Sequence, residues 1–379
     1  MSSRVRVLSV FGTRPEAIKI APVLGELERR SDRFESLVCV TAQHRQMLDP
    51  LLALFGIHAD ADLDLMQPNQ TLADLTARSL SRVAEIIDRF RPHVVLVQGD
   101  TTTAMASALA AFYHRVAVGH VEAGLRTGRR YSPFPEEMNR SVIGRIASLH
   151  FAPTVTARDA LLREGLSRSD VFVTGNTVID ALLQTVARVS DADLPCPIDP
   201  NTRLILVTAH RRESFGQPLE NICEALVDVA NRFSDVQIVY PVHLNPNVQQ
   251  VVHQRLSGVD RIQLLAPIDY AGMAAILQRA FLVLTDSGGL QEEAPALGKP
   301  VLVMRDDTER PEAVAAGTAR LVGTQSAAIV AAVSELLCDP AAYAVMASAV
   351  SPYGDGHAAE RIADILQDRL GGAVAASPN

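Results

Sequence analysis

The segment VVLVQGDTTTAMASALAAF, residues 94–112, places a run of apolar, β-branched residues directly before a helical pattern. The run Val94–Gln98 is typical of a buried strand, and a helix is predicted to begin just after Asp100. Similar apolar runs recur along the chain, with helical patterns between them. Near-continuous apolar strands separated by helices indicate parallel sheets covered on both faces. We therefore expect an α/β fold.

Further strands are predicted on both sides of this segment. In the first half of the chain they are Val5–Phe11, Leu37–Thr41, Val116–Val121, Leu149–Ala152 and Val171–Thr174. After the Pro- and Asp-rich stretch 190–202 they are Leu204–Thr208, Val236–Tyr240, Ile262–Leu265, Phe281–Thr285 and Val301–Met304. This order predicts two doubly wound domains joined near residues 174–202. Ligands of such domains bind beyond the carboxyl ends of the strands.

The composition of the chain argues against several classes of protein. A chain of 379 residues suggests two domains, and 48% apolar with 21% charged residues is ordinary for a globular enzyme. The net charge of −8 argues against a nucleic-acid-binding protein. No stretch reaches the roughly 18 apolar residues that a membrane span needs. The four cysteines show no CxxC spacing, so no disulfide framework or zinc site is predicted, and the cytoplasm is the expected location.

Charged residues of the first half follow the predicted strand ends. In FGTRPEAIKIAP, residues 11–22, Arg14 and Lys19 flank a helix start, which is a potential anion site or simply a charged surface. Asp100 is interpreted as a helix N-cap or as a reacting carboxylate. Residues 120–140 contain Glu122 and Glu136 in a stretch with little regular structure. Stabilisation of a helix dipole, about 0.3–1 kcal/mol, explains Glu136 but leaves Glu122 unexplained.

The second half carries cations and glycines at its strand ends. His210, Arg211 and Arg212 follow Leu204–Thr208, and three basic groups there favour phosphate binding over a structural role. The segment TDSGGLQEEAP, residues 285–295, opens a helix after a strand. Its glycines allow phosphate oxygens to approach backbone N–H groups.

Taken together, these motifs resemble the bacterial non-hydrolysing UDP-N-acetylglucosamine 2-epimerases over nearly the whole chain. The matching segments include FGTRPEAIK, TAQHRQML, QGDTTT, GHVEAGLRT, YSPFPEEMNR, HRRESFG, TDSGGLQEEAP and SPYGDG. The resemblance implies two Rossmann-like domains facing across a cleft, the GT-B type of fold. It also implies that the last helix returns to the first domain, with domains at residues 1–173 plus 356–379 and at 174–355.

The resemblance further implies roles for individual residues. Catalytic roles fall on Asp100, Glu122, Glu136 and His210. The implied UDP-sugar binding residues are Arg14, Lys19, Arg211, Ile268, Met273, Ser287, Gly288, Gly289, Glu293 and Arg310. The family often has an aromatic residue where Met273 stands. Some relatives bind a second UDP-GlcNAc as an activator, and the matching positions are Gln43, His44, Gln46, Gln70 and His243.

The implied reaction is the interconversion of UDP-GlcNAc and UDP-ManNAc through elimination of UDP and its re-addition, supplying precursors for cell-surface polysaccharides. It needs no redox cofactor and no metal, and a homodimer is expected. Three alternatives remain open: a GT-B glycosyltransferase, a hydrolysing epimerase, and a UDP-sugar sensor without catalysis. A diacetamido-uronic acid sugar is an alternative substrate.

Overall fold

The computed structural model describes residues 4–41, 45–67 and 70–376. The chain divides into two compact units. Unit 1 comprises Met1–Ala181 and Tyr353–Asn379, and unit 2 comprises Leu182–Pro352. The first boundary therefore lies eight residues later than the expected 173/174, and the return lies three residues earlier than 355/356. The boundary falls inside a helix, α7 (Thr177–Val186).

Unit 1 is built on a parallel sheet of seven strands in the order β3-β2-β1-β4-β5-β6-β7. These strands are β1 (Val5–Phe11), β2 (Phe34–Val40), β3 (Ala61–Asp62), β4 (Val94–Gln98), β5 (Ala117–Val121), β6 (Leu149–Ala152) and β7 (Val171–Val173). The chain order reverses between β1 and β4, which pair from Val7↔Val94 to Val10↔Val97. A reversal of this kind is where ligands bind in open α/β sheets, because the loops leaving the two strands diverge.

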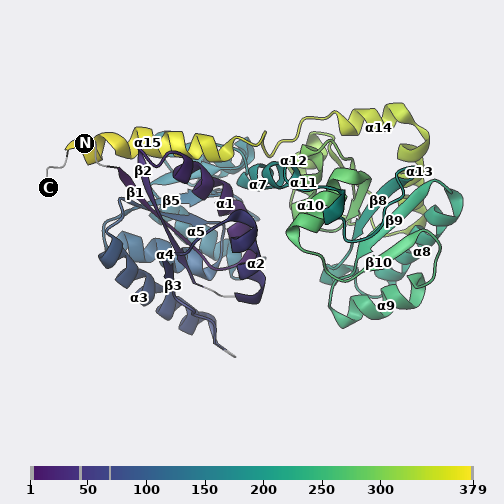
Figure 1. Ribbon diagram of the computed structural model, residues 1–379, viewed down its shortest axis with the longest axis horizontal. Coiled ribbons are helices and arrows are strands. Elements are labelled where there is room, and N and C mark those ends of the chain that lie inside the picture. The colour runs from purple at the N-terminus through teal and green to yellow at the C-terminus, as the bar shows by residue number, and fades with distance from the viewer. Residues whose placement is uncertain (1–3, 42–44, 68–69, 377–379) are drawn as a thin grey trace. The chain divides into compact units, whose positions relative to one another are not determined.

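The helices of unit 1 cover its sheet. They are α1 (Arg14–Arg29), α2 (Arg45–Phe55), α3 (Leu72–Phe90), α4 (Thr102–Tyr113), α5 (Glu136–Ile146), α6 (Val155–Arg163) and α15 (Ala358–Ala376), together with the start of α7. The helix α15, yellow in Figure 1, lies along the purple α1. Its Ile362, Ala363 and Leu366 are fully buried, and Asp364 forms a 2.5 Å ion pair with Arg30. The last helix is thus part of the first folding unit.

Unit 2 repeats the architecture with six parallel strands in the order β10-β9-β8-β11-β12-β13. These strands are β8 (Arg203–Thr208), β9 (Val236–Pro241), β10 (Ile262–Leu265), β11 (Ala280–Thr285), β12 (Val301–Val303) and β13 (Ala319–Leu321). Its helices include α8 (Gln217–Arg232), α9 (Pro246–Leu256), α10 (Tyr270–Arg279), α11 (Gly288–Ala296), α12 (Pro311–Ala315), α13 (Ser326–Cys338) and α14 (Pro340–Ala347). The order reverses between β8 and β11. The α/β class predicted from the sequence is confirmed in both units.

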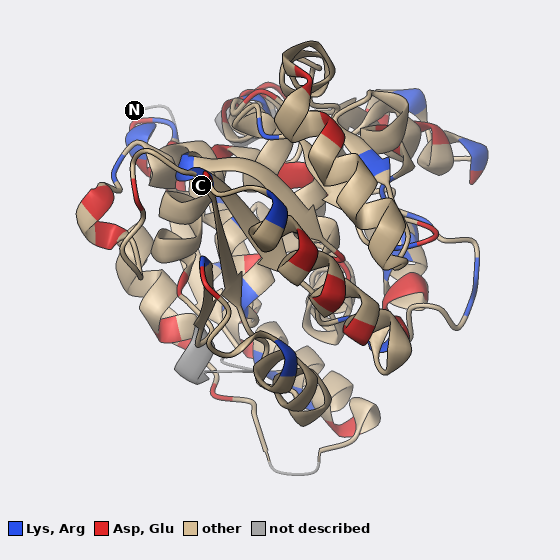
Figure 2. Cartoon of the chain, turned by 90° about the vertical axis from the view of Figure 1, so that its right-hand side faces the viewer, with Lys and Arg blue, Asp and Glu red and all other residues tan. Residues whose placement is uncertain are grey.

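Buried apolar residues and charged residues occupy different elements in both units. The strands of the two sheets carry mostly buried apolar residues, and Figure 2 shows charged residues mainly on helices and loops. No single helix among the described residues is long and apolar enough to cross a membrane. The bent pair α13 and α14 passes that test only when the two helices are joined.

Candidate active site

Glu16 joins the two loops that leave the sheet of unit 1 at its reversal. Its Oε2 accepts the N–H groups of Gly12 (3.0 Å) and Thr13 (2.8 Å), and its Oε1 accepts the hydroxyl of Thr101 (2.6 Å). The side chain is only 1% exposed, and this burial raises the pKa of Glu16. A residue in the first turn of α1 thereby fixes the β4–α4 loop, where Asp100 lies.

Glu122 follows β5 in a backbone conformation that few residues other than glycine adopt. Its φ is +66°, and such strain persists only where the surroundings enforce it. Three side chains donate to its carboxylate: Lys19 (2.5 Å), Gln98 (2.5 Å) and Asn176 (3.2 Å). The geometry therefore presents a buried, firmly held carboxylate at the end of β5.

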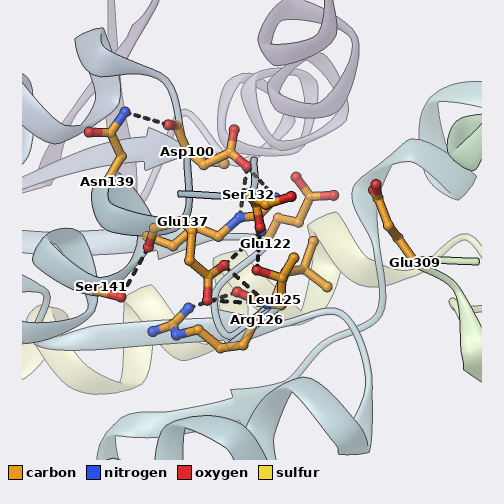
Figure 3. A network of polar contacts seen from close by, with 12 residues as sticks. Asp100, Glu122, Leu125, Arg126, Ser132, Glu137, Asn139, Ser141 and Glu309 are labelled. Atoms are coloured by element: carbon orange, nitrogen blue, oxygen red, sulfur yellow. Dashed lines mark hydrogen bonds and ion pairs between the residues drawn. The ribbon is translucent and has the colours of Figure 1, made fainter. Parts of the chain in front are cut away.

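Asp100 is held by a different set of residues. Its Oδ2 lies 2.8 Å from Nε and 2.7 Å from Nη2 of Arg140, and its backbone carbonyl accepts the Asn139 amide at 2.8 Å. Thr101, not Asp100, caps α4, because its hydroxyl accepts the N–H of Ala104 at 3.0 Å. The capping interpretation of Asp100 is therefore wrong. Figure 3 shows Asp100, Glu122 and Asn139 gathered in one region of unit 1.

The loop between β5 and α5 is organised by Glu137. Its carboxylate accepts the N–H groups of Thr127 (3.1 Å) and Gly128 (3.0 Å) and lies 3.2 Å from Nη1 of Arg140. Burial alone would raise the pKa of Glu137, but these hydrogen bonds and the charge of Arg140 outweigh it and lower the pKa. Glu136, the first residue of α5, is partly exposed. Glu137 thus has a structural task, while Glu136 stays accessible.

His120, on β5, holds the turn that follows β4 through a hydrogen bond. Its Nε2 lies 2.7 Å from the carbonyl oxygen of Gly99, so this nitrogen carries the proton. The ring is almost completely buried, and burial lowers the pKa of His120 to about 3. The neutral imidazole is therefore the form that this turn requires.

We expect the free energy of unfolding to fall as the pH decreases from about 6.5 towards 3. The unfolded chain binds a proton at His120 near pH 6.5, the ordinary value, whereas the folded state resists it to about pH 3. Because the unfolded state binds more protons in this window, stability is lost as the pH falls. Urea unfolding at about pH 7, 5.5 and 4.5 measures the slope.

The variant His120→Gln should show a shallower pH dependence in the same measurement, because its amide can still donate to Gly99 but does not titrate. Some slope will remain, since burial also lowers the pKa of His150 to about 4. An unchanged slope in His120→Gln would assign the acid sensitivity to other groups.

In unit 2 the cationic groups gather at the reversal between β8 and β11. His210 and Arg211 follow β8, and Asp286 and Ser287 follow β11. A methyl group placed on Gly288, at the start of α11, would lie 3.7 Å from Cζ of Arg310 and 3.8 Å from Nη2 of Arg211. Two guanidinium groups thus flank a helix N-terminus at a glycine, an arrangement suited to an anion such as phosphate.

The remaining predicted contacts of unit 2 lie around α10 and α11. Arg310 donates to the buried Glu292, and Tyr270 donates to Oε1 of Glu293 at 3.3 Å. Ile268 lies in the loop before α10 and Met273 in its first turn, and both are partly exposed. Glu293 therefore lies on α11, whereas Met273 lies on α10 and Ile268 in the loop before α10, all in the same unit.

The predicted activator positions are only partly described. Gln43 and His44 lie outside the described residues, as does the side chain of Gln46. In unit 1, Oε1 of Gln70 accepts a hydrogen bond from Arg78 at 2.5 Å. In unit 2, His243 stacks on His210 with ring centroids 5.3 Å apart. Among the residues described, no group of His, Cys, Asp and Glu could hold a metal ion.

Comparison with known proteins decides the family. The family described as UDP-N-acetylglucosamine 2-epimerase matches residues 26–367. The chain belongs to the UDP-N-acetylglucosamine 2-epimerase family. The enzyme of that name from Yersinia pestis is 55% identical over 372 residues, which cover 96% of this chain and 99% of that protein. The enzyme from Escherichia coli (strain K12) is also 55% identical, over 373 residues that cover 96% and 99%.

Solved structures of this epimerase family have the same fold. The UDP-GlcNAc 2-epimerase from Neisseria meningitidis, crystallised with UDP-GlcNAc, is 46% identical with a TM-score of 0.87, and the match covers 96% of this chain and 100% of that one. The glycotransferase of kitacinnamycin is only 13% identical but has a TM-score of 0.67 over 96% of this chain and 99% of its own. The predicted family and the GT-B type of fold are confirmed.

The sequence indicated which strand ends carry the epimerase motifs but missed several polar residues that support them. Lys19, expected beside a bound anion, forms its ion pair with Glu122. Arg14 is exposed on the first turn of α1. Gln98 and Asn176 hold Glu122, and Asp286 contacts the His210 loop. Gln98 could have been found from the sequence, because it is a polar residue that ends the apolar run VVLVQ.

Proposed function

We propose that this protein interconverts UDP-GlcNAc and UDP-ManNAc by reversible epimerisation at C2, without hydrolysis. Relatives that carry the name UDP-N-acetylglucosamine 2-epimerase match over almost their entire length, and one was crystallised with UDP-GlcNAc. The observation that carries the proposal is Glu122, a carboxylate held by three donors in a strained conformation at a strand end. Strained, buried carboxylates of this kind concentrate at functional sites.

The proposed chemistry begins with loss of UDP. The hydrogen at C2 is not adjacent to a carbonyl group, so its direct removal is very slow. As the bond from C1 to the phosphate oxygen breaks, its electron pair leaves with UDP and the positive charge at C1 acidifies C2–H. A base removes that proton, and a C1=C2 double bond forms, giving 2-acetamidoglucal. A proton then adds to the other face of C2, and the UDP oxygen attacks C1.

Each unit has groups suited to one part of this reaction. In unit 2, Arg211, Arg310, His210 and the N–H groups at Ser287–Gly289 can stabilise the charge on the leaving diphosphate. In unit 1, Asp100 and either Glu122 or Glu136 are the proposed proton-transfer groups. Two groups are needed because the proton leaves one face of C2 and returns to the other. The proposed reaction uses no redox cofactor, because elimination replaces hydride transfer. It uses no metal, because cationic side chains can offset the charge of the diphosphate.

Proton NMR of UDP-GlcNAc incubated with the purified protein in heavy water tests this proposal. No acceptor, NAD or metal is added. We expect UDP-ManNAc to accumulate with deuterium at C2, because the proton is exchanged in the intermediate. Unchanged, undeuterated UDP-GlcNAc would reject the activity on this sugar, and release of free ManNAc would reject the non-hydrolysing reaction.

The same proposal extends to the cellular setting. We infer a cytoplasmic homodimer that supplies UDP-ManNAc for cell-surface polysaccharides. Activation by a second UDP-GlcNAc, with contributions from Gln70 and His243, is a further part of it. A hyperbolic rate curve with UDP-ManNAc as sole substrate would argue against such activation.

A further inference from the structure

Asp286 is a buried carboxylate that the proposed reaction does not yet use. It follows β11 directly and is 0% exposed. Its Oδ2 accepts the backbone N–H groups of both His210 and Arg211, each at 2.7 Å. Asp286 also precedes Ser287 and the start of α11. One carboxylate therefore connects the loop after β8 with the helix start after β11.

The second oxygen of Asp286 faces the imidazole of His210. Oδ1 lies 3.4 Å from Nδ1 and accepts no hydrogen bond from the described residues. A buried carboxylate without a donor is costly, so an N–H group on Nδ1 is the partner that this position favours. The separation is slightly longer than a hydrogen bond, and such contacts often shorten when a substrate binds.

The imidazole of His210 is restricted on its other sides as well. The ring of His243 stacks on it at 5.3 Å with an interplanar angle of 14°. The hydroxyl of the buried Tyr240 donates to the carbonyl of Ala209 at 2.9 Å, which fixes the residue before His210. The backbone is thus anchored on both sides of His210, and one face of the ring is covered.

We propose that Asp286 is the positioning residue for His210: it accepts the proton on Nδ1 and stabilises the imidazolium, so that Nε2–H can donate to the diphosphate. The identity of the ligand rests on the proposed function above. Asp286 also holds the N–H groups of His210 and Arg211 in place, so the same carboxylate sets the orientation of two groups that meet the diphosphate. A negative charge beside Nδ1 further stabilises the imidazolium whenever Nε2 carries a proton.

The variant Asp286→Asn separates this role from a purely structural one. The amide oxygen can still accept the two backbone N–H groups, so the loop is retained. Its NH₂ group would face Nδ1 and favour the proton on Nε2 instead. We expect kcat to fall by about 100-fold or more with little change in KM, because the ligand still binds but the imidazolium that donates to the leaving diphosphate is no longer stabilised. Asp235→Asn, an exposed carboxylate of the same unit, is the matched control and should keep its turnover.

Long-range ¹H–¹⁵N NMR of protein labelled at histidine nitrogens reads the tautomer directly, with His210→Gln to assign the signals. We expect Nδ1–H in the wild type and Nε2–H in Asp286→Asn. A wild-type imidazole protonated on Nε2 alone, or an unchanged tautomer in Asp286→Asn, would overturn the proposal. This readout does not depend on turnover, so it remains decisive even if the protein fails to epimerise UDP-GlcNAc.

A double variant provides the energetic test. If Asp286 acts through His210, adding Asp286→Asn to His210→Gln lowers kcat no further than His210→Gln alone. Independent effects that multiply in the double variant would show that Asp286 acts by another route and would contradict the proposed role.

Discussion

Glu122→Gln is expected to reduce epimerisation by about 10²–10⁴-fold while the protein remains folded. Glutamine has the same size and can keep an oxygen near Lys19 and Asn176, which both donate to Oε1 of Glu122, but it can neither accept nor return a proton at C2. The loss should appear equally in turnover and in the rate of deuterium incorporation at C2, both measured by NMR in heavy water. Circular dichroism and urea unfolding check the fold.

Glu85→Gln is the matched control for this substitution. Glu85 is an exposed residue of α3 that pairs with the exposed Arg82, so it lies outside the proposed site. We expect native turnover in the control. If Glu122→Gln also keeps native turnover, Glu122 is not a proton-transfer group, and if Glu136→Gln behaves likewise, the proposed pair of acid and base fails.

Gly124→Ala should destabilise the protein by about 3–5 kcal/mol. The φ of Gly124 is +95°, and a methyl group there would lie 2.3 Å from the carbonyl oxygen of Ala157 and 3.0 Å from Cδ1 of Leu161. The oxygen belongs to the backbone of α6, so it cannot move aside without displacing that helix. Urea unfolding measures the free energy, and the soluble yield shows whether the variant folds.

Gly128→Ala separates the effect of contact from that of conformation. Gly128 lies in the same loop with φ +70°, but nothing lies within 4 Å of a methyl group placed on it. We expect a loss of only about 1–2 kcal/mol, the cost of the left-handed backbone. Equal losses in the two variants would mean that α6 yields readily to the added methyl group.

Most strands could be predicted to within one or two residues, because their apolar runs are long enough to be recognised. The run Leu149–Ala152 was predicted with its observed ends, and so was Ile262–Leu265. The strands β3 and β13 were missed. They contain two and three residues at sheet edges, too few to show a pattern, and only pairing with β2 and β12 defines them.

The positions of two candidate site residues could be predicted, but the residues that hold them could not. Strand ends are visible in the sequence, so the positions of Asp100 and Glu122 follow from the fold class. Their partners are not visible, because Glu16 meets Thr101 across 85 residues of sequence and Asn176 meets Glu122 across 54. The interpretation of Asp100 as a cap failed because Thr101, one residue further on, provides the same hydrogen bond.

The return of α15 to unit 1 has a consequence for biosynthesis. The ribosome makes residues 1–181 before unit 2, and the helix that packs along α1 only after unit 2. During translation, the surface of unit 1 that packs against Ile362, Ala363 and Leu366 stays uncovered until α15 is made, whereas unit 2 is complete at Pro352. The domain that begins first is therefore the one that is finished last, and chaperones have the longest access to it.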